Sequence, residues 1–230
     1  MSSFLEEAAF FGVAVSLMTY FAGVELKKKF KWGFLNPLLL SIIFTTAIIS
    51  LAKVDYQCYY AGAKYLSYLL TPATICLGIP LYEQFEILKK NVAAILAGII
   101  SGVITSLTCI LGMALIFNFS HKEYVTFLPK SITTAIGMGV SEEFGGYVSV
   151  TVAIIIITGV LGNVIGPGVL KLFRIKEPVA KGIALGTAAH AVGTSKAMEL
   201  GETEGAMSSL SVVVAGLLTV IGVSIFANFI

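Results

Sequence analysis

Four long segments of this sequence carry no charged residue, and they constrain the fold more than any other feature. They run from 32 to 52, 91 to 120, 144 to 170 and 205 to 230. A helix that spans a membrane needs about 20 consecutive, mostly apolar residues. Only 12% of the 230 residues are charged, whereas soluble domains carry about 25%. The sequence therefore predicts an all-α, polytopic integral membrane protein, with residues 1–230 as a single transmembrane domain.

Lysines next to the first apolar segment predict its orientation. Residues 5–24 are expected to span the membrane, and Lys27, Lys28, Lys29 and Lys31 follow in a loop. Basic loops stay on the cytoplasmic side, so we expect the 27–31 loop in the cytoplasm and the N-terminus outside the cell membrane. The first apolar run follows acidic rather than basic residues, which argues against a cleaved signal peptide.

The remaining segments predict six or seven full spans in total. Further spans are expected at 34–51, 91–119, 147–170 and 211–230, with a polar, tyrosine-rich connection at 53–64. Asn36 precedes Pro37, which suits an N-cap or a binding role. Gly98 and Gly102 have the spacing that favours close helix packing in lipid.

Two further apolar segments are too interrupted for ordinary spans. Residues 65–82 contain closely spaced prolines, which predict a discontinuous helix. In residues 127–146, Pro129 and Ser131 suit a helix start, and Gly137 and Gly139 suit an early end. This pattern favours a half-helix or re-entrant hairpin. Residues 74–85 weakly resemble residues 133–144, which suggests an internal repeat of the kind seen in transporters.

Residues 180–210 hold small, polar and ionisable side chains between apolar segments. Such residues are costly inside a membrane and mark functional sites, although the glycines could serve helix packing alone. Thr187, His190 and Thr194 would share one face of an unbroken helix. His190 titrates near neutral pH in ordinary surroundings, so it is a candidate for proton coupling or a hydrogen-bonded core residue. Glu142 is a second proton-coupling candidate, although it could lie in a solvated loop.

Other classes of protein are less well supported. We find no cluster of metal ligands and no nucleophile–base spacing, so we expect no enzyme activity, metal or cofactor. No basic patch suited to nucleic acid is present. Cys58, Cys76 and Cys109 are an odd count at wide spacings, so we expect no disulfide framework, and Cys76 and Cys109 are expected in the core.

Several short motifs together resemble the LrgB/CidB family over essentially the whole chain. They are Asn36-Pro37 and the segments 128–137, 180–182, 190–197 and 205–210. The resemblance implies two alternative functions. Bacterial members are described as antiholin-like or holin-like proteins that affect murein hydrolase activity and lysis with a small LrgA/CidA-type membrane partner. Plant plastid relatives resemble glycolate/glycerate carriers, and some bacterial relatives are associated with pyruvate movement.

The residues themselves favour a carrier for small monocarboxylates such as glycolate, glycerate, pyruvate or lactate, working by alternating access. The N-termini of broken helices attract anions, and Lys130 or Lys196 could supply a counter-charge or extend to the surface. The alternative is an antiholin-like regulator of lysis. We also expect a homo-oligomer. The predicted substrate-binding residues are Asn36, Lys130, Ser131, Thr133, Thr134, Asn163, Thr187, His190, Gly193, Thr194, Ser195 and Lys196.

Overall fold

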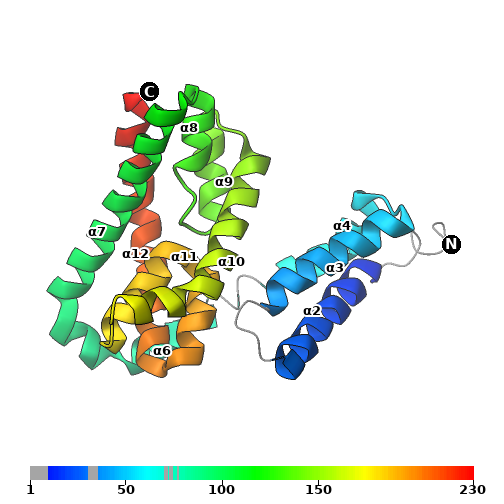
Figure 1. The fold of residues 1–230 in the computed structure, drawn as a ribbon, viewed down its shortest axis with the longest axis horizontal. Helices are drawn as coiled ribbons and strands as arrows, with labels where there is room; N and C mark the ends of the chain where they lie inside the picture. The colour runs from blue at the N-terminus through cyan, green and yellow to red at the C-terminus, as the bar shows by residue number, and fades with distance from the viewer. Residues whose placement is uncertain (1–9, 31–35, 70–71, 73–74, 77) are drawn as a thin grey trace. The chain divides into compact units, whose positions relative to one another are not determined.

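The regular elements of the protein are helices (Figure 1). The computed structural model describes residues 10–30, 36–69, 72, 75–76 and 78–230. Within these residues, three helices are long and apolar enough to cross a membrane: Lys89–Phe117, Val148–Leu172 and Glu202–Phe229. The predicted all-α, polytopic membrane fold is confirmed, whereas the total of six or seven spans stays a prediction.

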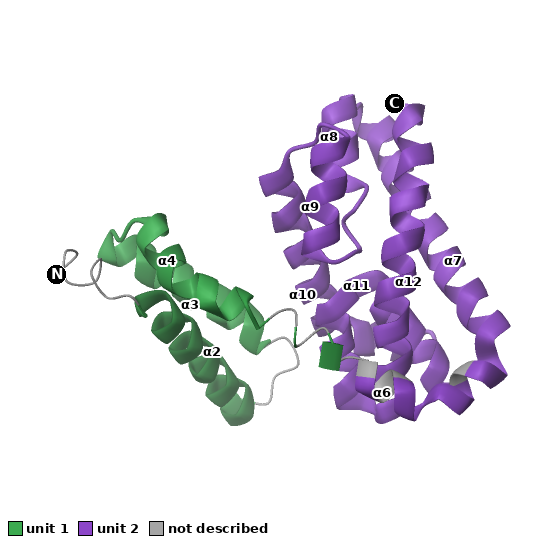
Figure 2. Ribbon diagram, turned by 180° about the vertical axis from the view of Figure 1, so that it is seen from behind, with its two compact units in different colours: residues 1–76 green, residues 77–230 purple. Residues whose placement is uncertain are grey.

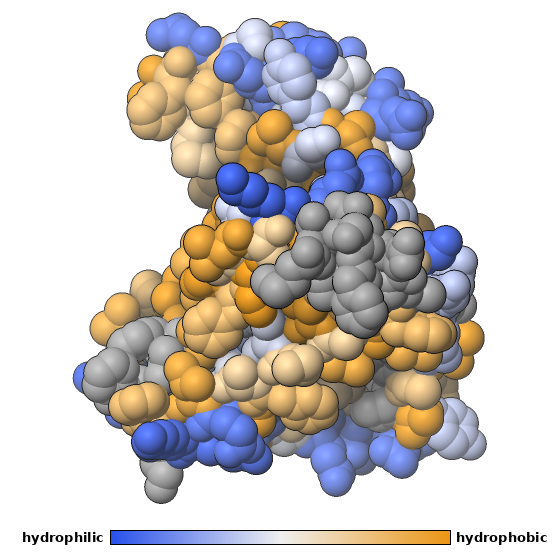
Figure 3. All heavy atoms as spheres, turned by 90° about the vertical axis from the view of Figure 1, so that its right-hand side faces the viewer, coloured by the Kyte–Doolittle hydropathy of each residue, from blue (hydrophilic) through white to orange (hydrophobic). Residues whose placement is uncertain are grey.

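The outer faces of these helices are apolar, as contact with lipid requires. Ile116 of the first long helix, Leu172 of the second and Leu217 of the third are all exposed. Figure 3 shows another face of the molecule, on which hydrophobic residues gather in patches between hydrophilic ones. Large exposed apolar areas mark membrane or protein contact surfaces.

The chain divides into two compact units, residues 1–76 and 77–230 (Figure 2). The single transmembrane domain expected over 1–230 stays a prediction. The first unit contains α2 (Phe11–Phe30), α3 (Pro37–Ala52) and α4 (Tyr56–Ser67). Asn36 is the N-cap of α3, because its Oδ1 accepts hydrogen bonds from the backbone N–H groups of Leu38 at 2.8 Å and Leu39 at 3.2 Å. The predicted capping role is confirmed.

Two expectations for the first unit are wrong. Helix α2 continues to Phe30 instead of ending at Val24, because lysines in a last helical turn interact favourably with the helix dipole. Residues 53–64 are not simply a connection, because most of them belong to α4. The carboxylate of Asp55 caps α4, and Gly12 of α2 lets the two helices approach closely at Tyr59.

The second unit holds the remaining elements. They are α6 (Gly78–Glu83), α7 (Phe85–Phe117), α8 (His121–Phe127), α9 (Thr134–Glu143), α10 (Val148–Leu172), α11 (Pro178–Leu200), α12 (Glu202–Phe226) and the 3₁₀ turn η1 (Ala227–Phe229). Its core lies around α7, α8 and α12, where Ile99, Tyr124 and Met207 are fully buried. The Tyr124 hydroxyl donates to the Phe226 carbonyl at 3.0 Å and ties α8 to the end of α12.

Helix α8 begins with a reciprocal cap. The Ser120 hydroxyl accepts from the backbone N–H of Glu123, while the Glu123 carboxylate accepts from the backbone N–H of Ser120 at 2.8 Å. The Ser120 hydroxyl and backbone N–H together hold the pKa of the Glu123 carboxyl below its usual value. This cap fixes where the chain turns after the long helix α7.

Residues 127–146 form a half-length helix, as predicted, but with different bounds. Pro129 lies in a turn after α8, and α9 starts at Thr134 with Thr133 at the N-cap. The helix passes Gly137 and Gly139 and ends at Glu143. Gly137 packs against the end of the Ile155 side chain of α10. Ten residues make a helix about 15 Å long, half of a bilayer's hydrocarbon thickness. A re-entrant path for this segment stays a prediction.

Helix α11 is broken in the middle, which confirms irregular backbone in residues 180–210. Ala189 has φ −131° and ψ 18°, and His190 has φ 42° and ψ −139°. Gly193 lies against the backbone carbonyl of Leu185, although eight residues of straight helix would separate the two by about 12 Å. The chain therefore turns back on itself, and we call residues 178–200 the helical hairpin.

Both halves of the helical hairpin pack on α12, in opposite directions. Gly182 and Gly186 of the first half contact Glu204 and Ser208, whereas Met198 of the second half contacts Gly205. Glycine at these positions lets the helix backbones touch. The predicted role of small residues in close packing is also confirmed at Gly98 and Gly102 of α7, which contact Ile183 and Thr187 of the hairpin.

The discontinuous helix and the internal repeat stay predictions. Residues 70, 71, 73, 74 and 77 lie outside the described residues. Beyond them, the short helix α6 precedes the long helix α7, just as α9 precedes α10.

The close packing predicts opposite effects for two matched substitutions. Gly186→Ala places a methyl group against the backbone of Ser208, so we expect it to destabilise the protein by about 1–3 kcal/mol. Gly112→Ala in α7 meets nothing within 4 Å and should be neutral or stabilising, since alanine favours helices by about 1 kcal/mol. Thermal unfolding in detergent, followed by circular dichroism, measures both. Equal unfolding temperatures for the two variants would contradict the packing.

Candidate functional site: a cavity beside the helical hairpin

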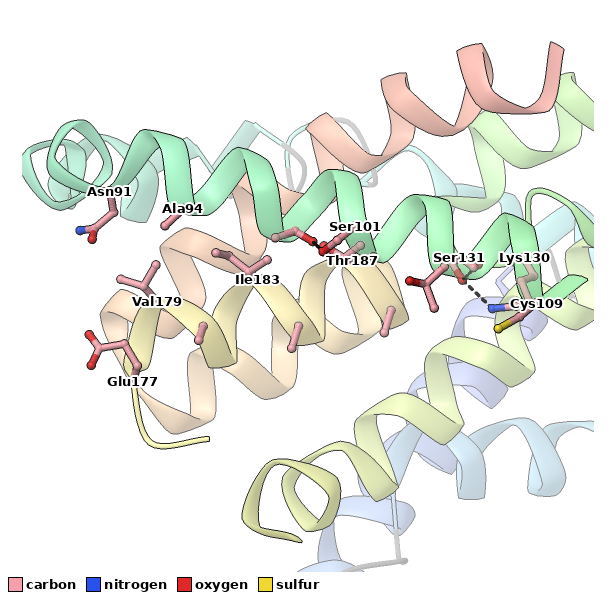
Figure 4. Close-up of a pocket in the computed structure, with 17 residues that line it drawn as sticks. Asn91, Ala94, Ser101, Cys109, Lys130, Ser131, Glu177, Val179, Ile183 and Thr187 are labelled. Atoms are coloured by element: carbon pink, nitrogen blue, oxygen red, sulfur yellow. Dashed lines mark hydrogen bonds between the residues drawn. The ribbon is translucent and has the colours of Figure 1, made fainter. Parts of the chain in front are cut away.

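A cavity of about 700 Å³ lies between α7 and the first half of the helical hairpin (Figure 4). The turn between α8 and α9 contributes Lys130 and Ser131, and Figure 4 places these two residues at one end of the cavity and Glu177 near the other. A concave site with a few polar groups among apolar walls is the usual form of a small-molecule site. This cavity is therefore the candidate binding site.

One face of α7 supplies small and hydroxyl-bearing residues to the cavity. Asn91, Gly98, Ser101, Thr105 and Cys109 all line it. They recur three, four or seven residues apart, which places them on one side of a helix. This face offers hydroxyl groups to a ligand without filling the space with bulky side chains.

Lys130 brings a positive charge to the cavity. Its Nζ donates to the Ser131 hydroxyl at 2.8 Å, and Ser131 is itself 3.2 Å from the hydroxyl of Ser106 on α7. Among the residues that the structure describes, no carboxylate pairs with Lys130. A cation with only hydroxyl partners in an apolar protein favours an anion nearby.

Thr187 lines the cavity, but its hydroxyl is buried in the cavity wall and has no partner there. The residue is 7% exposed, and its Oγ1 is buried without a hydrogen-bond partner. Buried polar groups normally have a partner, and leaving one unsatisfied costs about 1–3 kcal/mol. A ligand that reached Thr187 after a movement of the cavity wall would remove this cost.

A second group of polar residues surrounds the turn of the helical hairpin. His190 Nε2 donates to the Ile155 carbonyl at 3.0 Å, and Asn163 Nδ2 donates to the Val192 carbonyl at 2.9 Å. These two hydrogen bonds join the helical hairpin to α10, where Gly159 leaves room for the His190 ring. Since the carbonyl can only accept, neutral His190 carries its proton on Nε2.

Thr194 joins the same turn to α12. Its Oγ1 donates to the His190 carbonyl at 3.1 Å and lies 2.9 Å from the hydroxyl of Ser208. Thr194 and Ser208 are fully buried. His190 is therefore a buried, hydrogen-bonded residue. Neither His190 nor Thr194 lines the cavity. Proton coupling through His190 stays a prediction.

The structure separates the predicted binding residues into groups. Lys130, Ser131 and Thr187 lie together in the cavity. Asn163, His190, Gly193, Thr194 and Ser195 lie at the turn of the helical hairpin.

The other candidates lie elsewhere. Lys196 pairs with Glu199 at 2.6 Å, so its charge already has a partner. Thr133 and Thr134 begin α9, and Glu142 is exposed in the last turn of that helix. Asn36 belongs to the first unit.

Sequence reasoning missed the hydroxyl-bearing face of α7. The sequence does carry a signal for this face, because small and polar residues recur at helical spacing from Asn91 to Cys109. Only the glycines among them were predicted to have a role. The prediction that Cys76 and Cys109 lie in the core is wrong, because both are exposed. Neither forms a disulfide. Cys109 lines the cavity, where Figure 4 shows it beside Lys130. In the described part of the chain, no three metal-ligating side chains are grouped.

These features define a helical membrane protein with a cavity, mostly apolar but lined by several hydroxyl groups and one lysine, beside a broken helix. The chain belongs to the LrgB-like family, whose sequence pattern matches residues 16–229. It is 38% identical over 222 residues to the proteins named "Antiholin-like protein LrgB" of Bacillus mycoides (strain KBAB4) and Bacillus cereus (strain B4264). Each match covers 96% of both chains. No solved structure matches the chain.

The two buried threonines predict different responses to the same substitution. Thr194→Val removes hydrogen bonds to His190 and Ser208 and should destabilise the protein by about 1 kcal/mol. Thr187→Val removes a hydroxyl without a partner and should leave stability unchanged or raise it. Thermal unfolding of both variants in detergent tests this order. A larger loss for Thr187→Val would mean that its hydroxyl has a partner in the ligand-free protein.

Proposed function

We propose that this protein is an antiholin-like membrane protein that restrains cell lysis. The observation that supports this role is the similarity to relatives of that name, at 38% identity over 96% of both chains. A match over the full length includes the helical hairpin, the cavity and the long helices together. We further propose that it acts with a small LrgA/CidA-type membrane partner and as a homo-oligomer.

The lysis role predicts that this chain can replace a relative. In a Bacillus cereus strain that lacks its matching protein, expression of this chain should slow autolysis relative to an empty vector. Gly186→Ala, which disturbs the packing of the helical hairpin, should restore less of the effect than Gly112→Ala. The fall of culture turbidity after energy poisoning measures the lysis rate. Unaltered lysis with normal membrane levels of the protein would rule out this role.

The cavity favours a second function, transport of a small monocarboxylate. Lys130 would pair with the carboxylate, and the hydroxyls of Ser131 and Ser106 lie near enough to add hydrogen bonds. After a movement that exposes its hydroxyl, Thr187 would donate to a hydroxyl or keto oxygen of the same small molecule. Glycolate, glycerate, pyruvate and lactate carry both groups. Neither of the two functions involves a chemical reaction.

Alternating access would require a moving element, and the helical hairpin is suited to that part. The first half lines the cavity, while the turn at Ala189 and His190 is held to α10 by single hydrogen bonds. A change at this turn would widen or close the cavity against α7. Helical elements of this kind move about a few backbone positions at their ends.

Transport predicts a charge-dependent uptake. Proteoliposomes with this protein should take up labelled glycolate, pyruvate or lactate faster than empty vesicles. Lys130→Met should reduce uptake by about tenfold or more, since charged hydrogen bonds contribute about 1.5–3 kcal/mol, whereas Lys130→Arg should retain part of it. Lys122→Met, an exposed lysine of α8 outside the cavity, is the matched control.

The outcomes separate the two functions. Uptake that equals empty vesicles for all three acids excludes this carrier role, whatever the lysis assay shows. A lysis effect that persists in Lys130→Met would show that regulation does not depend on the cavity.

A further inference from the structure

A second pocket lies at the end of α10, and half of its lining is basic. Lys171 is in the last turn of α10, Arg174 and Lys176 follow in the loop, and Lys181 is in the first half of the helical hairpin. The pocket has a volume of about 340 Å³. We call it the basic pocket, and neither proposed function uses it.

Among the residues that the structure describes, three of the four cations have no acidic partner. Lys181 pairs with the buried carboxylate of Glu204 at 3.4 Å. Lys171, Arg174 and Lys176 are exposed, and no carboxylate within the described residues forms an ion pair with them. Glu177, the nearest acidic residue in the chain, lines the cavity beside α7 instead of this pocket. The basic pocket therefore keeps a net positive charge.

Helix capping does not account for these cations. The last carbonyls of α10 accept backbone hydrogen bonds: Val169 from Phe173 at 3.0 Å, Leu170 from Ile175 at 2.8 Å and Lys171 from Arg174 at 3.1 Å. Arg174 has φ 55°, which closes the helix end as a left-handed residue commonly does. The basic side chains are therefore not needed to cap these carbonyls, and all three line the same pocket.

The other walls of the basic pocket are apolar. Pro167, Leu170, Ile175 and Leu200 form them. Beside the pocket, Leu172 and Phe173 are 76% and 70% exposed at the end of a membrane-spanning helix. A membrane-spanning helix ends where the hydrocarbon of the bilayer meets the lipid headgroups. A ligand for this pocket would need a negative head and an apolar body.

We propose that the basic pocket binds the phosphate headgroup of an anionic phospholipid, with the glycerol and upper acyl chain along the apolar wall. Arg174 suits a phosphate because its guanidinium can donate two parallel hydrogen bonds, and Lys171 and Lys176 add charge. Basic residues at a span end also set orientation, but that role depends on position alone and needs no shared pocket. Basic pockets between membrane helices are established places for acidic headgroups.

The test compares lipid binding by the whole protein and two charge-matched variants. One variant carries Lys171→Gln, Arg174→Gln and Lys176→Gln. The control carries Lys27→Gln, Lys28→Gln and Lys29→Gln, which remove the same charge from the end of α2. Native mass spectrometry from detergent counts bound phosphatidylglycerol against phosphatidylcholine. A further series replaces phosphatidylglycerol by inorganic phosphate or glycerol phosphate at the same concentration.

We expect the parent and the control to retain phosphatidylglycerol over phosphatidylcholine, and the pocket variant to bind it at least about tenfold more weakly. Equal losses in both variants would show attraction to any basic cluster and overturn the site. Unchanged binding in the pocket variant would overturn it as well. Binding of glycerol phosphate or inorganic phosphate as strong as that of the lipid would reject the lipid as the occupant. Circular dichroism of both variants confirms that they are folded.

Discussion

Backbone that leaves the helical conformation at membrane depth must find its hydrogen bonds within the protein, and the second unit is built around one such break. In lipid, irregular backbone is tolerated only where it is buried in protein or lines a polar cavity. Near the break at Ala189 and His190, the His190 carbonyl accepts from the Thr194 hydroxyl, and the Val192 carbonyl accepts from Asn163 of α10. The His190 ring and the Thr194 hydroxyl in turn bind Ile155 of α10 and Ser208 of α12. Glycines in α10 and in the helical hairpin allow the close contacts. The cavity then exists because the first half of the hairpin stands beside α7 while its turn is held elsewhere.

This arrangement explains why the polar residues form two groups with different chemistry. The residues at the turn satisfy one another, so their contribution is to keep the break in place. In the cavity, the Lys130 ammonium has only a hydroxyl partner and the Thr187 hydroxyl has none. Unsatisfied polar groups are costly in a dry interior, which makes the cavity rather than the turn the place where a ligand would bind.

Much of this could be predicted from the sequence because the membrane limits the alternatives. Charge-free segments indicated the long helices, Asn36-Pro37 indicated a capped helix start, and small residues around His190 indicated the break. The wrong predictions concern segments that could form either a helix or a loop, and the sequence pattern alone does not decide between the two. The lysines after Val24 continue α2 rather than end it, since they suit a helix C-terminus. The tyrosines near Tyr59 lie in a helix that Asp55 caps and that packs closely against Gly12 of α2. The small polar face of α7 lines a cavity because of where the helical hairpin lies beside it. The spacing of residues in the sequence does not predict that position.

The two halves of the helical hairpin run in opposite directions, and this also determines how many times the chain crosses the membrane. Gly182 lies beside Glu204, so α11 starts and α12 starts at the same level of the second unit. Residues 178–200 therefore bring the chain back to the side where α10 ended. A straight helix of 23 residues would be about 35 Å long and would carry the chain across the bilayer. A bend of two residues thus decides on which side of the bilayer α12 begins, and hence which compartment Ile230 faces.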